Sequence, residues 1–475
     1  MTQTLDSSVS ELLAALDAGN ISARELMEMV LQRIDVSQPS LNAFTTLRDA
    51  DLLLQESRES DERRSRGEAR VLEGIPFGAK DLEDVAGLLT SYGSGAFRNN
   101  IARSDSTQVA RLRAAGAIVV GKTNTPEFGY TAVTKNHVFG TTANPWNFER
   151  TPGGSSGGSS AAIAGGIIPI ATASDGGGSI RIPASCTGCY GLKPSLGRVP
   201  EGPHSLWNID HTSAWGPLTR TVQDAARQLD VTCGPHASDA FSLPPAGISY
   251  LDTLSELSDS GRKLRIAFSA DLGYAVVQPD IAAIVEDAAR VFESLGHELL
   301  EIKGGPPEPG RDWLLLGAID QLSKLHETIP GNEDEFGRSF LNGIKVGDKM
   351  NAERWGVYRK RRQELNAWCE QLFNDFDLLV TPTLPYDPPA AKGPLPAEVD
   401  GRPQPSANIG SFTMPFNMSM NPAASLRAGA SQAGLPVGLQ IVAARHRDDL
   451  VLQASYAFER ERPWHPLWPD PIFES

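Results

Sequence analysis

The sequence TPGGSSGGSSAAIAGGIIPIATASDGGGSIRIP, from Thr151 to Pro183, is the passage that most restricts the fold. It places two clusters of glycine and serine on either side of an apolar segment, Ala161 to Ala173. Gly/Ser runs often form flexible linkers, but an ordered apolar segment follows this one at once. That segment is too short and too rich in glycine to span a bilayer, which needs about 20 apolar residues. We therefore expect two structured loops around a buried helix and strand.

Around this passage, expected helices alternate with apolar strands. Two capping boxes, Ser8 to Glu11 and Ser22 to Glu25, each precede an amphipathic run and predict two opening helices. Further helices are expected at 49–66, 106–115, 159–165, 279–295, 353–373 and 448–459, and strands at 117–121, 167–173, 264–269, 298–302, 378–381 and 437–443. This alternation predicts an α/β fold with a largely parallel or mixed β-sheet core covered by helices.

The domain organisation follows from the same pattern. We expect one large domain over residues 1–475, with an N-terminal helical segment at about 5–66. The Pro-rich stretch from Pro382 to Pro405 is expected to be a long surface loop rather than a linker, because strand and helix signals resume after it.

Composition restricts the partners. The 475 residues are 40% hydrophobic and 21% charged, which excludes a disordered tail, a coiled coil and a disulfide miniprotein. The formal net charge of −15 repels a phosphate backbone and an anionic membrane, so we expect a small-molecule partner and neither nucleic acid nor a membrane. Two short basic runs, Arg359 to Arg362 and Arg445 to Arg447, are interpreted as solvated surface. The composition neither requires nor excludes a homodimer.

The N-terminus and the cysteines bear on location and cofactors. Met1 to Ser22 has no basic cluster followed by an apolar core, so it is not a secretory signal, and we expect a cytoplasmic protein. Four cysteines in so long a chain give no disulfide framework. Cys186 and Cys189 make a single C-x-x-C without a second pair or a histidine at metal spacing, and are interpreted as small core residues. We expect neither a metal nor a cofactor.

Two familiar loop chemistries fit the glycine clusters poorly. A phosphate-binding loop needs G-x-x-x-x-G-K-[ST], and neither cluster contains the lysine. Gly153, Ser155 and Gly157 match the G-x-S-x-G pattern of a nucleophile elbow. That turn must follow a buried strand, however, and Asn144 to Pro152 contains no apolar run. Nucleotide binding and an α/β-hydrolase are therefore disfavoured.

A hydrolytic serine needs a base and backbone donors for the oxyanion. Gly176, Gly177 and Gly178, directly before Ser179, can supply such donors, because residues without Cβ let the main chain fold around a small anion. None of the eight histidines lies in a motif that nominates it as the base. A lysine can serve where burial keeps it neutral, and Lys80 in GIPFGAKDL, reached through a loop-like Gly-Ala step, is a candidate.

Six ordered blocks of this sequence resemble the amidase signature family. The passage from Gly153 to Ala184 is similar to that family's defining stretch. The other blocks are GIPFGAKD (74–81), GKTNTPEFG (121–129), CYGLKPSLGRVP (189–200), TPTLP (381–385) and GLPVGLQIV (434–442). The resemblance covers nearly the whole chain. It implies the amidase signature fold and hydrolysis of a carboxylic amide to an acid and an amine or ammonia.

The resemblance also implies roles for single residues in a Ser-cisSer-Lys scheme. Lys80 corresponds to the family's lysine, Ser155 to its bridging serine, held by a cis peptide bond, and Ser179 to its nucleophile. Neutral Lys80 would take a proton through Ser155 while Ser179 forms an acyl-enzyme, which water then hydrolyses. The implied oxyanion donors are the main-chain amides of Gly176, Gly177, Gly178 and Ser179.

Other residues near the blocks are assigned less specifically. Members of the family often have threonine at the position of Gly176, and they usually have proline at the position of Arg427. Asp175 and Arg181 are expected to pair and brace the loop, and Asp81 is expected to orient groups around the lysine. Aromatic and amide residues that could line an acyl pocket, although each also fits ordinary packing, are Tyr130, Trp146, Trp207, Phe412, Phe416 and Asn417. The sequence does not identify the amide substrate.

Two functions from different classes are compared. The first is a stand-alone amidase acting on small carboxamides, aryl amides or oligoamides. The alternative is the amidase subunit of a glutaminyl-tRNA amidotransferase complex, which passes ammonia to a partner. The segment from Thr123 to Val133, the DGGGS form and the acidic balance favour the first. A binding protein with a dead site is disfavoured because Lys80, Ser155 and Ser179 are all present.

Overall fold

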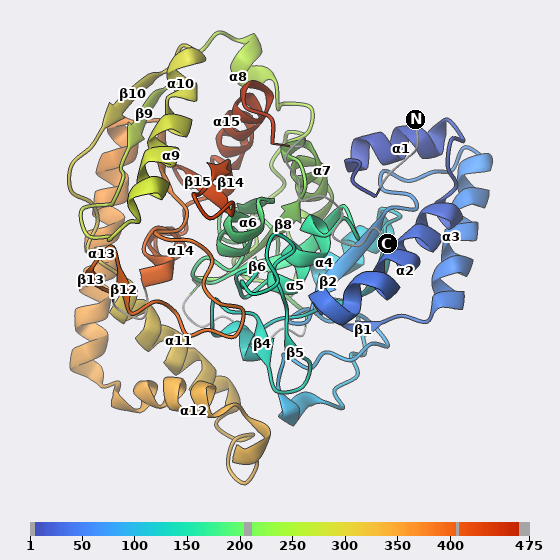
Figure 1. The fold of residues 1–475 in the computed structure, drawn as a ribbon, viewed down its shortest axis with the longest axis horizontal. Helices are drawn as coiled ribbons and strands as arrows, with labels where there is room; N and C mark the ends of the chain where they lie inside the picture. Colours follow the sequence, from blue (N-terminus) through green and yellow to red (C-terminus); the bar gives the residue numbers. More distant parts are fainter. Residues whose placement is uncertain (1–4, 204–210, 405–407, 465–475) are drawn as a thin grey trace.

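The computed structural model describes residues 5–203, 211–404 and 408–464. The chain begins with helices α1 (Val9–Asp17) and α2 (Ala23–Leu41). Ser8 and Ser22 cap them, since each hydroxyl accepts the N–H of the glutamate three residues later, whose carboxylate accepts the serine N–H in return. Both predicted capping boxes are therefore confirmed. Together with α3 (Ala50–Ser65), these helices cover one end of the molecule (Figure 1).

One mixed sheet organises the chain. Within the described residues its eleven strands follow the order β1-β3-β2-β6-β8-β7-β14-β15-β11-β9-β10. They are β1 (Phe44–Leu47), β2 (Pro76–Lys80), β3 (Ile118–Thr123), β6 (Ile170–Asp175), β7 (Tyr190–Lys193), β8 (Ala214–Thr219), β9 (Arg265–Phe268), β10 (Glu298–Glu301), β11 (Leu378–Pro382), β14 (Ala423–Ala430) and β15 (Pro436–Ala443). Strands β3, β2 and β6 run parallel, as do β10, β9 and β11, while the strands from β6 to β11 pair antiparallel. The expected α/β domain with a mixed sheet is confirmed.

Helices pack on this sheet around two large apolar clusters. The first includes Phe77 and Ile170 and is covered by α1 to α3, α4 (Thr107–Ala114) and α5 (Gly157–Ala164). The second includes Leu426 and Ile441 and is covered by α7 (Val222–Thr232), α9 (Pro279–Ala289), α10 (Val291–Ser294) and α15 (Asp448–Glu461). Figure 1 shows α1 to α3 at one end and α9, α10 and α13 (Ala352–Asp375) at the other.

Shorter elements complete the chain. The remaining helices are α6 (Arg181–Thr187), α8 (Glu256–Asp259), α11 (Gly310–Leu325), α12 (Arg338–Ile344), α14 (Met414–Met418) and the 3-10 turns η1 (Gly95–Phe97), η2 (Glu127–Gly129), η3 (Glu333–Glu335), η4 (Lys345–Lys349) and η5 (Asn408–Gly410). Two small hairpins pair β4 (Lys135–Asn136) with β5 (Gly140–Thr141) and β12 (Glu398–Val399) with β13 (Arg402–Pro403). Helices α11 to α13 form one excursion between β10 and β11, which both pair with β9.

Two of the expected elements have different bounds in the structure. The helix expected at 279–295 divides at Arg290 into α9 and α10, where the Glu293 N–H bonds to the Arg290 carbonyl three residues earlier and tightens the turn. The strand expected at 167–173 begins at Ile170, because the Ile167 N–H still bonds to a carbonyl of α5. The expected loop after β11 is irregular up to residue 404 apart from the β12–β13 hairpin.

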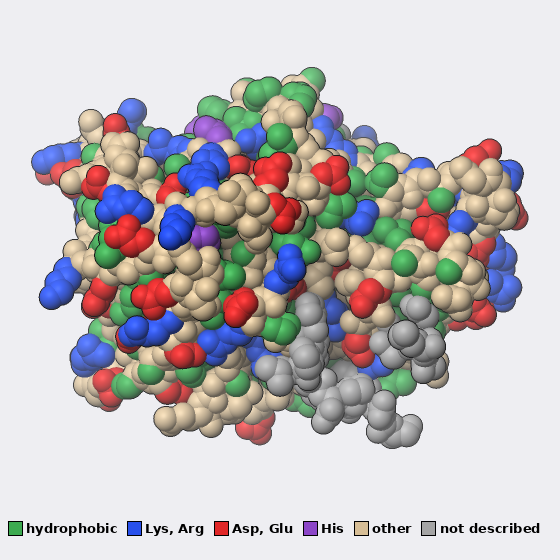
Figure 2. All heavy atoms as spheres, turned by 90° about the horizontal axis from the view of Figure 1, so that it is seen from above, with side chains coloured by type: hydrophobic (Ala, Val, Ile, Leu, Met, Phe, Trp, Pro, Cys, Tyr) green, Lys and Arg blue, Asp and Glu red, His purple; other side chains and the backbone are tan. Residues whose placement is uncertain are grey.

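No helix within the described ranges has the length and apolar character needed to cross a bilayer. On the face shown in Figure 2, acidic and basic side chains are intermingled rather than gathered by sign. This face therefore offers no broad cationic surface to a phosphate backbone.

Candidate active site

Lys80 is the last residue of β2, which pairs in parallel with β3 and β6. The expected loop before Lys80 is wrong, because Gly78 and Ala79 belong to the strand. A Cβ at Gly78 would lie 2.7 Å from Thr123 Cγ2 and 2.8 Å from Ile168 Cδ1. The glycine thus marks close packing on the sheet rather than a turn.

The Lys80 amine is enclosed and surrounded by hydroxyl and carbonyl oxygens. Its Nζ lies 2.8 Å from Ser155 Oγ, 3.0 Å from Ser174 Oγ and 3.3 Å from the Ser174 carbonyl oxygen. Burial lowers the pKa of Lys80 to about 7, although the charges of Glu83 and Asp175 act in the opposite direction. A substantial fraction of Lys80 is therefore neutral near pH 7 and able to accept a proton.

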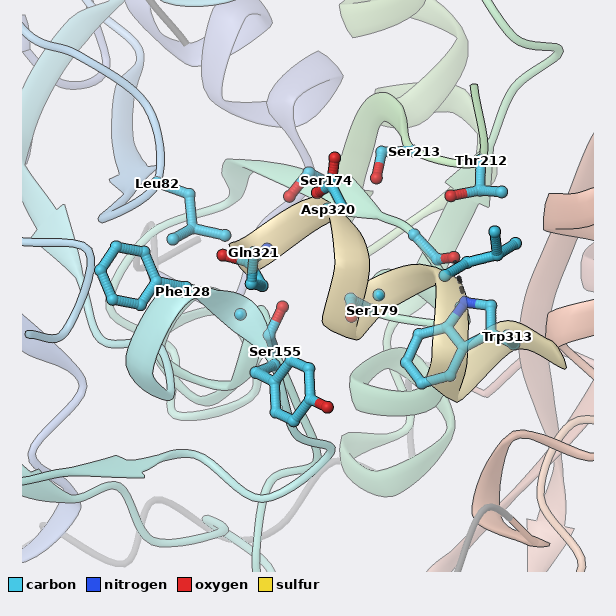
Figure 3. A pocket seen from close by; sticks show the side chains of 16 residues that line it. Leu82, Phe128, Ser155, Ser174, Ser179, Thr212, Ser213, Trp313, Asp320 and Gln321 are labelled. Carbon is cyan, nitrogen blue, oxygen red and sulfur yellow. Dashed lines mark hydrogen bonds between the residues drawn. The ribbon is translucent and has the colours of Figure 1, made fainter. Parts of the chain in front are cut away.

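Ser155 lies between Lys80 and a pocket. The peptide bond between Gly154 and Ser155 is cis, as the family resemblance implies, and α5 begins two residues later. Ser155 is only 2% exposed, yet it lines the same pocket as Ser179, where Figure 3 shows both side chains. Gly129 leaves room beside it, since a Cβ there would lie 3.0 Å from Ser155 Oγ.

Ser179 stands in the turn between β6 and α6. Because β2 and β6 are parallel neighbours, their carboxyl ends meet at one edge of the sheet, which brings Ser179 to the side of the sheet where Lys80 ends its strand. The Ser156 N–H bonds to the Ser179 carbonyl at 3.3 Å and ties the two serine segments together. The structure thus gathers Lys80, Ser155 and Ser179 at one site.

Side chains from distant segments hold the glycine loop before Ser179. Trp313 Nε1 donates to the Gly176 carbonyl at 2.7 Å, and Thr413 Oγ1 donates to the Gly177 carbonyl at 2.6 Å. Both peptide units are therefore fixed from outside the loop, although their glycines could adopt many conformations on their own.

The next peptide units of the loop are fixed by α6 and by Asp175. The Gly178 carbonyl accepts the Ile182 N–H at 2.6 Å, and the Gly178 N–H donates to Asp175 Oδ1 at 2.6 Å. The Gly178 amide is thus bonded within the protein, in contrast to its expected role as an oxyanion donor. The N–H groups of Gly177 and Ser179 lie on peptide planes whose carbonyls are already held.

Asp175 and Arg181 form a buried ion pair at 2.9 Å, with no exposed surface on either side chain. The carboxylate also accepts the N–H groups of Ile180 and Arg181, and Arg181 donates to Gln440 Oε1 at 2.7 Å and Asn417 Oδ1 at 2.6 Å. Burial opposes ionisation of Asp175, but the Arg181 charge lowers the pKa of this carboxyl below its ordinary range. The expected pairing that braces the loop is confirmed.

Asp81 is bonded to Lys122 and Ser91, which lie close to it in the fold. Its carboxylate pairs with Lys122 Nζ at 2.9 Å, in a contact where both side chains are buried, and accepts the Ser91 hydroxyl at 2.5 Å. Asp81 thus anchors Lys122, and its charge is balanced there rather than at Lys80.

The pocket in front of Ser155 and Ser179 has two kinds of wall. Phe128 and Tyr130 pack on Phe340, with ring centroids 5.0 and 5.4 Å apart, so the aromatic part is rigid. The apolar lining includes Leu82, Phe128, Tyr130 and Leu316, and the polar lining includes Thr212, Ser213, Asp320 and Gln321 (Figure 3). Asp320 forms an ion pair with Lys324 one turn further along α11, at 2.5 Å.

The predicted acyl-pocket residues are only partly placed there. Tyr130 lines the pocket. Phe412 and Phe416 are core residues with no exposed surface. The Asn417 amide donates to the Asp175 carbonyl oxygen at 2.6 Å, so Asn417 holds the end of β6 next to the glycine loop. Trp207 lies outside the described residues.

Trp146 and Arg427 pack on each other near the end of α6. The Trp146 Nε1 donates to the Thr187 carbonyl at 2.7 Å, and the Arg427 guanidinium lies 4.5 Å from the centre of the Trp146 ring. Burial lowers the pKa of Arg427 to about 10. The basic residue that replaces the usual proline therefore contacts an aromatic face rather than the pocket.

Helix α11 supplies pocket residues that sequence reasoning missed, namely Trp313, Leu316, Gly317, Asp320 and Gln321. They recur at helical spacing, but the same spacing describes any helix with one buried face. Among the described residues, no three His, Cys, Asp or Glu side chains are grouped so that they could hold a metal ion. Cys186 and Cys189 are buried as expected, and burial raises the pKa of Cys189 to about 12.

A protein-family model described as Amidase matches residues 25–452. The chain belongs to the amidase family. Among its curated relatives, "Acylamidase" from Rhodococcus erythropolis is 36% identical over 478 residues, which cover 96% of each chain. A glutamyl-tRNA(Gln) amidotransferase subunit from Roseiflexus castenholzii (strain DSM 13941 / HLO8) is 33% identical over 99% of each chain. The crystal structure of a bacterial aryl acylamidase of the amidase signature family matches with a TM-score of 0.91, at 30% identity and 99% coverage of each chain.

The amidase is therefore a hydrolase of carbon–nitrogen bonds in carboxylic amides, as the sequence predicted. Of the two curated relatives described, the more similar is the acylamidase. This favours an amidase over an amidotransferase subunit.

Proposed function

We propose that this amidase works through an acyl-enzyme on Ser179. Ser179 Oγ attacks the amide carbonyl, its proton passes to Ser155, and the Ser155 proton passes to neutral Lys80. The C–N bond breaks as the leaving nitrogen takes a proton back along the same path. Water then hydrolyses the ester on Ser179 and releases the acid. The 2.8 Å contact between Lys80 Nζ and Ser155 Oγ carries this proposal.

The oxyanion of the tetrahedral intermediate requires N–H donors beside Ser179. We assign this role to the main-chain amides of Gly177 and Ser179, and the neighbouring Gly176 amide is a further donor. The Gly178 amide is left out because it donates to Asp175. Loss of one such donor lowers turnover by about 10² to 10³-fold in other serine hydrolases.

The proposed substrates are aryl acylamides, in which an acyl group is joined to the nitrogen of an aromatic amine. Phe128 and Tyr130 contribute aromatic rings to the pocket lining, and an aromatic wall favours contact with a flat apolar group. The similarity to an acylamidase and to an aryl acylamidase supports the same class.

The test is a panel of aryl, aliphatic, peptide-like and glutamine amides, offered to the purified chain alone. We expect turnover of aryl amides by the wild type and none by Ser179→Ala, with the acyl group found on Ser179 by mass spectrometry after a rapid acid quench. Turnover by folded Ser179→Ala would overturn the assignment. Glutamine hydrolysis that appears only after a partner protein is added would support the amidotransferase subunit instead.

A further inference from the structure

Trp313 joins the pocket wall to the glycine loop. It lies in the first turn of α11, lines the pocket, and donates from Nε1 to the Gly176 carbonyl at 2.7 Å (Figure 3). The Trp313 ring also packs closely against Gly177, since a Cβ at Gly177 would lie 2.4 Å from Trp313 Cζ2. One side chain thus fixes the loop both by a hydrogen bond and by contact.

The hydrogen bond determines where the next N–H points. The peptide unit that begins with the Gly176 carbonyl ends with the Gly177 N–H, and it is not among the three cis bonds of the described chain. In a trans peptide the C=O and N–H point in opposite directions. Trp313 therefore turns the Gly177 N–H away from itself, on a residue that lines the same pocket as Ser179.

The neighbouring peptide unit shows the effect of such a contact. Thr413 holds the Gly177 carbonyl at 2.6 Å, and the N–H at the opposite edge of that unit, Gly178, meets Asp175 Oδ1 at 2.6 Å. One unit is thus fixed at both edges by the protein. The unit fixed by Trp313 is held at its carbonyl edge, and its N–H edge belongs to a pocket-lining residue.

We propose that Trp313 is a positioning residue for amide hydrolysis, whose indole N–H holds the Gly176–Gly177 peptide so that the Gly177 N–H donates to the oxyanion. The inference rests on the proposed acyl-enzyme mechanism, and it deepens that mechanism by assigning a role to a side chain of the substrate-pocket helix. Trp313 acts through the main chain and does not itself touch the reacting atoms.

The test compares two inhibitors of similar size. 2,2,2-Trifluoroacetophenone accepts Ser179 Oγ at its carbonyl carbon, the hydroxyl proton passes to Ser155 and Lys80, and the carbonyl oxygen becomes an anion. Acetophenone occupies the pocket without a comparable addition. The ratio of their inhibition constants therefore reports oxyanion stabilisation apart from pocket fit.

Trp313→Phe keeps an aromatic ring and removes the donor. We expect kcat for the best amide of the panel to fall about tenfold, with KM changed less than about twofold, because the interaction acts in the transition state. Trifluoroacetophenone should bind about tenfold more weakly and acetophenone about equally. Trp313→His, which can place a ring N–H near the position of Nε1, should recover part of the loss in kcat and part of the loss in trifluoroacetophenone binding. Leu316→Ala, from the same helix and pocket wall, should change the inhibition constants of both ketones by the same factor.

Equal weakening of both ketones by Trp313→Phe, or an unchanged kcat, would overturn the role of Trp313 and reduce it to a pocket wall. Thermal unfolding of each variant separates these outcomes from a folding defect, and Trp313→His provides a second variant if Trp313→Phe is unstable. Failure of the proposed mechanism itself would appear differently, as turnover by Ser179→Ala.

Discussion

The Lys80 amine and the Ser155 hydroxyl lie 2.8 Å apart, and both side chains are almost wholly enclosed by protein. Enclosure removes the water that would otherwise stabilise the lysine as an ammonium ion. Enclosure therefore explains why the amine can be neutral, and the contact with Ser155 identifies the hydroxyl from which it can take a proton.

Replacement of Lys80 by methionine tests the base. Lys80→Met should lower kcat/KM by about 10² to 10⁴-fold, the usual contribution of a general base, while the apolar chain fills the buried space. The matched control is Lys193→Met. Lys193 is also buried with its pKa lowered to about 7, but it donates to the Pro194 carbonyl and does not line the pocket. Comparable losses in the two folded variants would contradict a specific role for Lys80.

The pH dependence follows from the protonation of Lys80. An ammonium ion cannot accept a proton, so kcat/KM should rise with pH through an apparent pKa of about 7 and level off above it. A profile from pH 5.5 to 9 with the best amide of the panel measures this limb. An activity that is independent of pH over this range would argue against a neutral lysine base.

Glu83 should affect the pH at which kcat/KM rises. The Glu83 carboxyl is buried, where it accepts from Gln108 Nε2 and Ser106 Oγ, and burial raises its pKa to about 7, so it becomes charged over the same pH range in which activity rises. In its charged form it raises the pKa of Lys80. Glu83→Gln removes that charge and keeps the size of the side chain, so the apparent pKa of the activity profile should move to lower pH. A shift to higher pH would show that the two groups are not coupled in this way.

Ser155→Ala tests the relay. Loss of the Ser155 hydroxyl interrupts the proposed proton path from Ser179 to Lys80, so the burst of amine release that reports acylation should slow by about 10² to 10⁴-fold. Ser156→Ala is the control, because Ser156 is the neighbouring buried hydroxyl and bonds to the Ser174 carbonyl at 3.4 Å. Unchanged burst kinetics in Ser155→Ala would remove Ser155 from the proton path.

Asp175→Asn tests the brace behind the nucleophile. The neutral amide leaves the Arg181 charge uncompensated in the interior, which should lower the free energy of unfolding by about 3 to 5 kcal/mol in urea titrations. Asp287→Asn is the control, because its ion pair with Arg462 lies on the surface, with 69% of the Asp287 side chain exposed, and should cost under about 1 kcal/mol. Equal stabilities of the two variants would show that the buried pair does not hold the loop.

Local signals predicted the opening helices and several strands. Ser8 and Ser22 satisfy the first free N–H groups of α1 and α2 with their own side chains, so the helix starts can be predicted from the sequence next to them. Three of the strands that were missed are rich in glycine, alanine and proline: β2 reads PFGAK, β8 AWGPLT and β14 AASLRAGA. Such strands lack the branched, alternating pattern of β-structure, and pairing with their neighbours determines their conformation.

The candidate site was predictable to a similar extent. Lys80, Ser155 and Ser179 lie in motifs, so they could be proposed without coordinates. The partner of the Gly178 amide could not be predicted, because it depends on how Asp175 is oriented by Arg181. Trp313 was missed because its partner, the Gly176 carbonyl, comes from a distant part of the chain, and no sequence pattern marks a main-chain acceptor.

The excursion that carries α11 leaves the sheet after β10 and returns at β11, whereas Lys80 belongs to β2 and Ser179 to the turn after β6. Residues 302–377 could therefore be exchanged with those of a related enzyme as a cassette that changes the preferred amide and leaves the proton path in place. Such a chimera would be efficient only if the incoming segment also placed an N–H donor at the position of Trp313. The same segment would therefore determine both the substrate preference and the turnover rate.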